Sequence, residues 1–104
     1  MSKILRAVNF YRNKKDRLNA YTLQLIQVDI IIEKQTSFFI QIITSERGRM
    51  FDNQIAFKVS KAAAEENFHK VHMAMRSMIQ PEREVWTCGR PAEFPTIEKG
   101  ANHD

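Results

Sequence analysis

Apolar and polar residues alternate along the first half of the chain, and this alternation predicts β-strands. Every second residue is apolar from 21 to 25 and again from 26 to 32, with a change of parity at the adjacent pair Leu25 and Ile26. A helix is the alternative, because apolar residues of this stretch also recur at spacings of three and four. Six of its residues are β-branched, which suits a pleated strand better than a helix. We therefore predict a strand over 21–32 that is bulged or bent near residue 25.

Two further strands are predicted after it. The segment 38–43, FFIQII, is apolar at both parities, which is typical of a strand whose second face is covered by a helix or by another subunit. Residues 45–49 have the composition of a hairpin turn, in which Gly48 supplies a positive φ. The returning segment 54–59 has one apolar and one polar face. Together these segments predict an antiparallel sheet.

The periodicity changes to that of a helix from Lys61 onwards. Ser60 is a favourable N-cap, and Pro81 cannot continue a helix. Six apolar residues of the segment fall on one arc of roughly 100°, namely Ala64, Phe68, Val71, Met75, Met78 and Ile79. The segment 61–79 is thus predicted to be an amphipathic helix that packs on the sheet.

The expected fold is α+β, with an antiparallel sheet of three to five strands packed against one long amphipathic helix in the C-terminal half. Residues 1–80 are assigned to a single domain, in which the segment near 4–10 is read as a strand, with a short helix as the alternative. Residues 81–104 are assigned to an extended, partly ordered tail, in which 84–88 is a candidate short strand. All three prolines and two of the three glycines lie in that tail. Hairpin strands followed by a long helix form an order similar to that of small dimeric single-strand binders of the coactivator and whirly type, and no motif residue is carried over.

Positive charge is concentrated at the start of the chain. Six of the sixteen basic residues lie within the first seventeen positions, which carry a formal charge of +5 against −1 for residues 18–104. Such a cluster attracts anions, most commonly nucleic acid or lipid headgroups. We expect cations here and on the 45–49 hairpin to hold phosphates, and Phe10 or Tyr11 to stack on unpaired bases. The alternative is a solvated basic strand and turn, with one of these two aromatic residues in the core. The predicted nucleic-acid-binding residues are Arg6, Phe10, Tyr11, Arg12, Lys14, Lys15, Arg17, Arg47, Arg49 and Lys58.

Other reactive residues are interpreted as structural. His69 and His72 have a spacing that could share a zinc ion with Cys88 or His103, but no spacing rule fixes a third ligand. We expect His72 to border the core and His69 to face solvent, and we predict no metal site. Cys88 alone has no signature of a nucleophile.

The carboxylate pairs Glu65–Glu66 and Glu82–Glu84 are expected at the solvated surface rather than in a pocket that would tune them for catalysis. No nucleotide-binding or catalytic motif stands in the chain, so we expect no enzyme activity and no cofactor.

The expected function is that of a small, non-enzymatic nucleic-acid-binding or regulatory protein, with single strands favoured. One helix cannot cover both faces of the sheet, so a homodimer is expected. A single cysteine favours a reducing, cytoplasmic location, and no apolar stretch is long enough to span a membrane, so no membrane partner is expected. One alternative is a protein-binding adaptor or inhibitor, of a kind found among mobile-element and phage products, that acts through an apolar dimer or sheet face. Another is a binder of an anionic small molecule.

Overall fold

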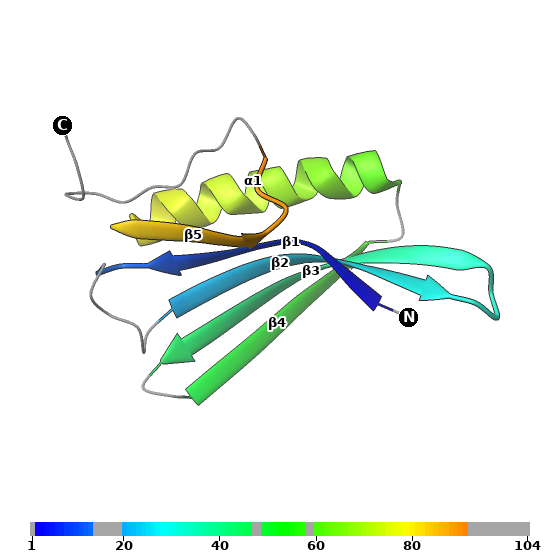
Figure 1. The fold of residues 1–104 in the computed structure, drawn as a ribbon, viewed down its shortest axis with the longest axis horizontal. Helices are drawn as coiled ribbons and strands as arrows, with labels where there is room; N and C mark the ends of the chain where they lie inside the picture. The colour runs from blue at the N-terminus through cyan, green and yellow to red at the C-terminus, as the bar shows by residue number, and fades with distance from the viewer. Residues whose placement is uncertain (1, 14–19, 47–48, 58–59, 92–104) are drawn as a thin grey trace.

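The protein forms one curved sheet with a helix along one of its faces (Figure 1). The computed structural model describes residues 2–13, 20–46, 49–57 and 60–91. In chain order the elements are β1 (Ser2–Tyr11), β2 (Ala20–Ile30), β3 (Gln35–Glu46), β4 (Arg49–Phe57), α1 (Lys61–Ile79) and β5 (Arg83–Cys88). All neighbouring strands are antiparallel, in the order β4-β3-β2-β1-β5. The predicted α+β fold is confirmed.

The sheet does not end at the predicted domain boundary at residue 80. β5 pairs with β1, with Tyr11 opposite Arg83 and Phe10 opposite Glu84. The segment assigned to the tail therefore begins with a strand of the sheet. Residues 92–104 lie outside the part of the chain that the structure describes.

The strand prediction for 21–32 is confirmed over most of its length, but the predicted irregularity lies in a different strand. β2 pairs with β3 in an unbroken register from Ala20 to Ile30. The register shift is in β1, between Ile4 and Arg6, which lie opposite Ile26 and Leu25. Because neighbouring strand residues face opposite sides, the change of parity in β2 moves its apolar residues from the helix side to the open side of the sheet.

The core lies between α1 and the middle strands. Its fully buried side chains include Val8, Phe10, Leu23, Leu25 and Ile40, against which the buried helix residues Ala64, Phe68 and Met75 pack. The helix has the predicted bounds. The Ser60 hydroxyl accepts a hydrogen bond of 3.2 Å from the amide of Ala63, and at the other end Gln80 adopts the left-handed conformation before Pro81.

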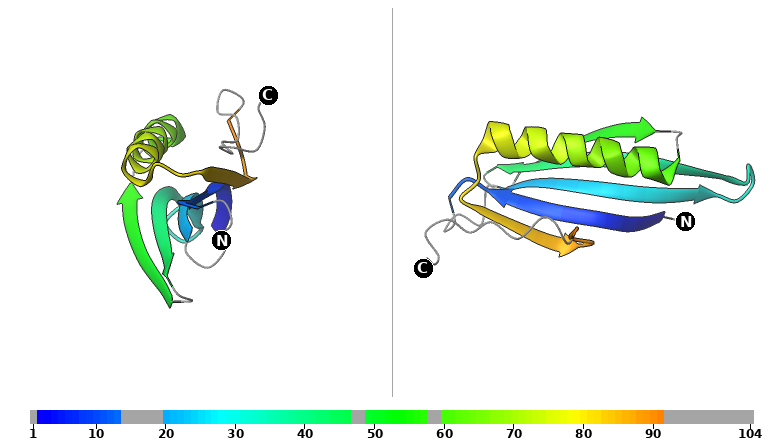
Figure 2. Two further views of the ribbon diagram at one scale, coloured as in Figure 1. Left: turned by 90° about the vertical axis from the view of Figure 1, so that its left-hand side faces the viewer. Right: turned by 90° about the horizontal axis from the view of Figure 1, so that it is seen from above.

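The helix covers only one face of the sheet, as the end-on view shows (Figure 2). On the open face, Phe39 and Ile43 are half-buried beside polar neighbours of β2 and β3. Gln24 and Gln41 are paired in register there, and the Thr22 hydroxyl donates a hydrogen bond of 2.7 Å to the side-chain oxygen of Asn9. The two apolar faces predicted for 38–43 are therefore in different surroundings, one packed under the helix and one on the open side.

Candidate nucleic-acid interface

The sheet topology brings basic segments from separate parts of the chain to one end. β1 ends at Tyr11 and β2 begins at Ala20, so the connection 12–19 starts and finishes at this end, on the left in Figure 1. The β3–β4 connection lies at the same end, because Ala20 is opposite Ser45 and Glu46 is opposite Arg49. We call this region the basic end and define it by Tyr11, Arg12, Tyr21, Arg83 and the connections 12–19 and 46–49.

Two arginine–tyrosine contacts mark the basic end. The guanidinium carbon of Arg12 lies 5.6 Å from the centre of the Tyr21 ring, and that of Arg83 lies 5.0 Å from the centre of the Tyr11 ring. Both separations are within the range of about 6 Å over which a cation is attracted to an aromatic face. Arg12 is exposed, and the two tyrosines are half-buried. Tyr21 is opposite Phe10 in register and packs against the core on the helix side, so the basic end combines positive charge with one planar group, Tyr11, on which an unpaired base can stack.

The base-stacking role predicted for Phe10 is corrected by the structure. The Phe10 side chain is fully buried in the core, with its ring centre 5.6 Å from that of His72. A strand residue in the core directs its neighbour to the other face, so the burial of Phe10 places Tyr11 on the open side of the sheet. Of the two aromatic residues considered, only Tyr11 is placed to contact a ligand.

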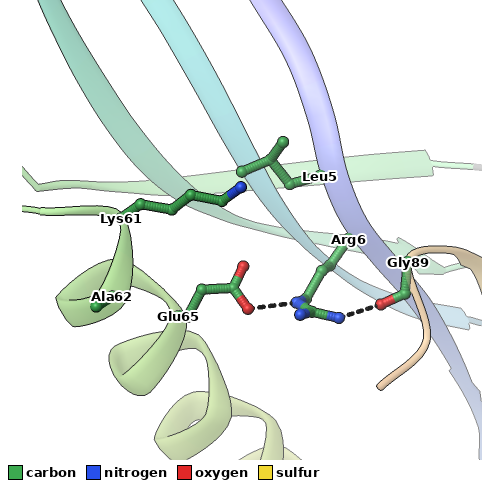
Figure 3. A pocket seen from close by; sticks show the side chains of 6 residues that line it. All are labelled: Leu5, Arg6, Lys61, Ala62, Glu65 and Gly89. Carbon is green, nitrogen blue, oxygen red and sulfur yellow. Dashed lines mark hydrogen bonds and ion pairs between the residues drawn. The ribbon is translucent and has the colours of Figure 1, made fainter. Parts of the chain in front are cut away.

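Arg6, also predicted to bind phosphate, serves a structural contact away from the basic end. Its Nε donates a hydrogen bond of 2.6 Å to Glu65 at the start of α1, and its Nη1 donates to the carbonyl oxygen of Gly89 (Figure 3). These residues line a hollow of about 500 Å³ together with Leu5, Lys61 and Ala62. The Glu65 carboxylate offsets the charge of Arg6. Through its two hydrogen bonds, the Arg6 side chain links β1 to α1 and to the chain after β5.

Gly89 is required for this close approach. It has a φ of +59°, and a Cβ atom at this position would collide with the backbone oxygen of Leu5, the residue at the register shift of β1. A residue without a side chain is therefore needed where the chain leaves β5.

The structure describes only one of the remaining predicted nucleic-acid-binding residues. Arg49 begins β4, of which the structure describes the backbone, so it lies at the basic end. The other five predicted cations lie outside the described residues; these are Lys14, Lys15, Arg17, Arg47 and Lys58.

A buried carboxylate anchors the strand that carries Arg83. Glu84 is fully buried and accepts hydrogen bonds from Arg76 at 2.7 and 2.9 Å, from His72 Nε2 at 2.9 Å and from Trp86 Nε1 at 3.1 Å. Burial alone would raise the pKa of Glu84, but the hydrogen bonds and positive charge from His72 and Arg76 outweigh it and lower the pKa from 4.5 to about 2. Glu84 is thus ionised at neutral pH and can only accept, so Nε2 of His72 carries the proton of this hydrogen bond.

The expectation that Glu84 is solvated is wrong, whereas its neighbour Glu82 is exposed. The predicted places of His72, which is buried, and of His69, which is exposed, are confirmed. The signal that could have found the cluster is the four-residue spacing of His72 and Arg76 on one helix face. Glu84 and His72 are both buried, and the hydrogen bond between them joins α1 to β5.

No known family matches this chain. Comparison with protein-family models, with curated proteins and with solved structures finds no similar protein. The similarity to single-strand binders therefore concerns the order of elements alone. Within the described residues, no three His, Cys, Asp or Glu side chains are grouped so that they could hold a metal ion. Nor does this part of the chain contain a helix that is long and apolar enough to cross a membrane.

Proposed function

We propose that the protein binds single-stranded nucleic acid at the basic end and acts by binding rather than by catalysis. The observation that carries the proposal is the pair of arginine–tyrosine contacts at the end of the sheet from which the connection 12–19 departs. Arg12 and Arg83, with the cations of that connection, neutralise phosphates, and Tyr11, on the open face of the sheet, stacks on a base. Single strands are favoured because a duplex keeps the faces of its bases stacked inside.

The open face next to Tyr11 supports a path for the bound strand. Asn9 and Thr22 lie opposite each other in the register of β1 and β2, and Gln24 and Gln41 form the neighbouring pair on β2 and β3. Amide side chains both donate and accept hydrogen bonds, which suits the edges of bases. A bound single strand of nucleic acid that begins at the basic end would continue over these polar side chains.

The test is fluorescence anisotropy of labelled single-stranded DNA, duplex DNA and RNA at about 50 and 200 mM salt, a range over which phosphate contacts are revealed. Replacing Lys14, Lys15 and Arg17 by alanine should weaken single-strand binding at least about tenfold at the lower salt and flatten its salt dependence. The matched control is the triple alanine variant of Lys3, Lys34 and Lys61. These exposed lysines carry the same charge at the opposite end of the molecule, so their loss should have a much smaller effect. Equal loss in both variants, or none in the first, contradicts the proposal.

A second candidate is the protein-binding adaptor or inhibitor, and a different observation favours it. Ile31 and Ile32 are 79% and 96% exposed in the turn between β2 and β3, and adjacent exposed apolar side chains are typical of contact surfaces. This function predicts a protein partner and no salt-sensitive affinity for polyanions. Purification with an affinity-tagged chain that recovers nucleic acid and no protein would count against it.

A further inference from the structure

A second aromatic ring lies on the open face of the sheet, farther from the basic end than Tyr11. Phe38 is buried in the core under the helix, so Phe39, the next residue of β3, is directed to the opposite face. The helix leaves that face open (Figure 2), and Phe39 is half-buried there. Phe39 is therefore an accessible aromatic side chain that is not part of the basic end.

The surroundings of Phe39 are apolar. In the register of the sheet, Ile26 is opposite Ile4 of β1 and Phe39 of β3, and directly opposite residues of neighbouring strands share a face. Ile4 is 45% exposed, and Ile26 is half-buried. An aromatic ring stacks on the face of any base, because every base has a π-face. A row of three apolar side chains that includes such a ring is thus suited to an unpaired base.

The register also gives the separation between Phe39 and Tyr11. Asn9, Thr22 and Ile43 lie opposite one another on β1, β2 and β3. Tyr11 is two residues from this row towards the basic end, and Phe39 is four residues from it in the other direction. At about 3.3 Å per residue and about 4.8 Å between strands, the two aromatic residues are roughly 22 Å apart.

We propose that Phe39 is a second stacking site for the same bound strand, which spans about four nucleotides from the Tyr11 ring to the Phe39 ring. The inference rests on the proposed binding of single strands at the basic end. A single strand that is unstacked between the two rings extends to roughly twice the 3.4 Å per nucleotide of a duplex strand. About three such steps cover the distance between the rings, so a shorter oligonucleotide cannot contact both.

The side chains between the two rings are compatible with this path. On β2 and β3, the intervening positions of the open face carry uncharged residues, namely Thr22, Gln24, Gln41 and Ile43. Uncharged side chains do not repel the phosphates of a strand that crosses them. The phosphate contacts are then made at the basic end, and Phe39 contributes stacking without changing the number of counterions released.

The test is fluorescence anisotropy, in which unlabelled oligothymidylates of about two to about eight nucleotides compete with a labelled single strand. Phe39→Ala should weaken the binding of the longer oligonucleotides at least about fivefold. The affinity for the dinucleotide should not change, because a dinucleotide bound at Tyr11 does not reach Phe39. The slope of log affinity against log salt concentration should also stay that of wild type.

Three further variants separate stacking from a change in the fold. Phe39→Leu keeps an apolar side chain without a ring, so it should retain the fold, verified by circular dichroism, and still lose affinity for the longer oligonucleotides. Phe39→Tyr keeps the ring and should bind as wild type does. Met73→Ala removes an exposed apolar side chain from the helix side of the molecule, and it should leave the affinity for every length unchanged.

The failure of this inference can be told apart from the failure of the proposed function. If wild type binds single strands and Phe39→Leu binds every length equally well, the strand does not stack on Phe39 and the inference is overturned alone. An equal loss for the dinucleotide and the longer oligonucleotides also overturns it, because the loss then does not depend on reach. A wild-type chain without salt-sensitive affinity for any single strand overturns both.

Discussion

The two ends of the sheet share one scaffold and differ in chemistry. At the basic end, two arginines lie over two tyrosines, and the connections at that end contain most of the predicted phosphate-binding cations. At the opposite end, the β2–β3 turn exposes two isoleucines and only one acid and one lysine. The strands between them are held by the same ladder of hydrogen bonds. The comparison shows that the strands set the positions of the ends, while the connecting segments decide what each end can bind.

Removing the Glu84 carboxylate should disrupt the basic end most strongly. Glu84→Ala leaves the Arg76 guanidinium and His72 without their shared buried acceptor, and breaking a buried ion pair on one side costs about 3 to 5 kcal/mol of unfolding free energy. Chemical denaturation measures the loss. If the variant still folds, hydrogen exchange should be faster in β5 and in the part of β1 next to it than in the β2–β3 hairpin.

Glu82→Ala is the matched control for this loss. Glu82 is two residues away and exposed, so its removal should change the unfolding free energy by less than about 0.5 kcal/mol. Similar losses in the two variants would show that the buried cluster does not hold the basic end together.

Acid should weaken the same anchor. Because the pKa of Glu84 is lowered from 4.5 to about 2 in the folded protein, its contribution to stability is fully present above pH 4.5 and is lost as the pH falls from 4.5 towards 2. Thermal melts across this interval should show that the melting temperature of the wild-type protein decreases. The decrease should be smaller for Glu84→Gln, which has no carboxylate to protonate at this position. An identical acid dependence in the two proteins would assign the decrease to other carboxylates.

Removing the Tyr11 ring should have a smaller effect, limited to binding. Stacking on a base contributes about 1 to 3 kcal/mol, so Tyr11→Ala should weaken single-strand binding by about 5-fold to 150-fold. Tyr11→Phe keeps the ring and should bind nearly as wild type does. Anisotropy titrations of both variants decide between stacking and a role of the hydroxyl, since the latter predicts equal losses in the two.

Local signals in the sequence were sufficient for most of the fold. Ser60 and Pro81 bound α1 because capping and the missing proline amide act within a few residues of the chain. β-branched residues identified β2 for the same reason. The extra residue of β1 was not visible, because it depends on how β1 aligns with β2 and not on the pattern of either strand alone.

The candidate site could be predicted only where it depends on composition. The clustering of cations is a property of the sequence. The position of Arg83 over the Tyr11 ring and the ion pair between Arg6 and Glu65 depend instead on contacts between segments that are far apart in the chain. The sequence indicated a candidate short strand over 84–88 without showing that His72 and Arg76 would supply partners for Glu84. A carboxylate with unknown partners is reasonably expected at the surface, which is why its burial was missed.

The pairing of β5 with β1 has a consequence for how the protein is made. Within the described residues, β1 precedes and β5 follows the other strands, so Tyr11 meets Arg83 only after the intervening hairpins and helix have been synthesised. Contacts between segments so far apart in sequence slow folding, because a long loop must close before they form. The Arg83–Tyr11 contact therefore cannot form until residue 83 has left the ribosome, and a shorter nascent chain would lack this part of the basic end.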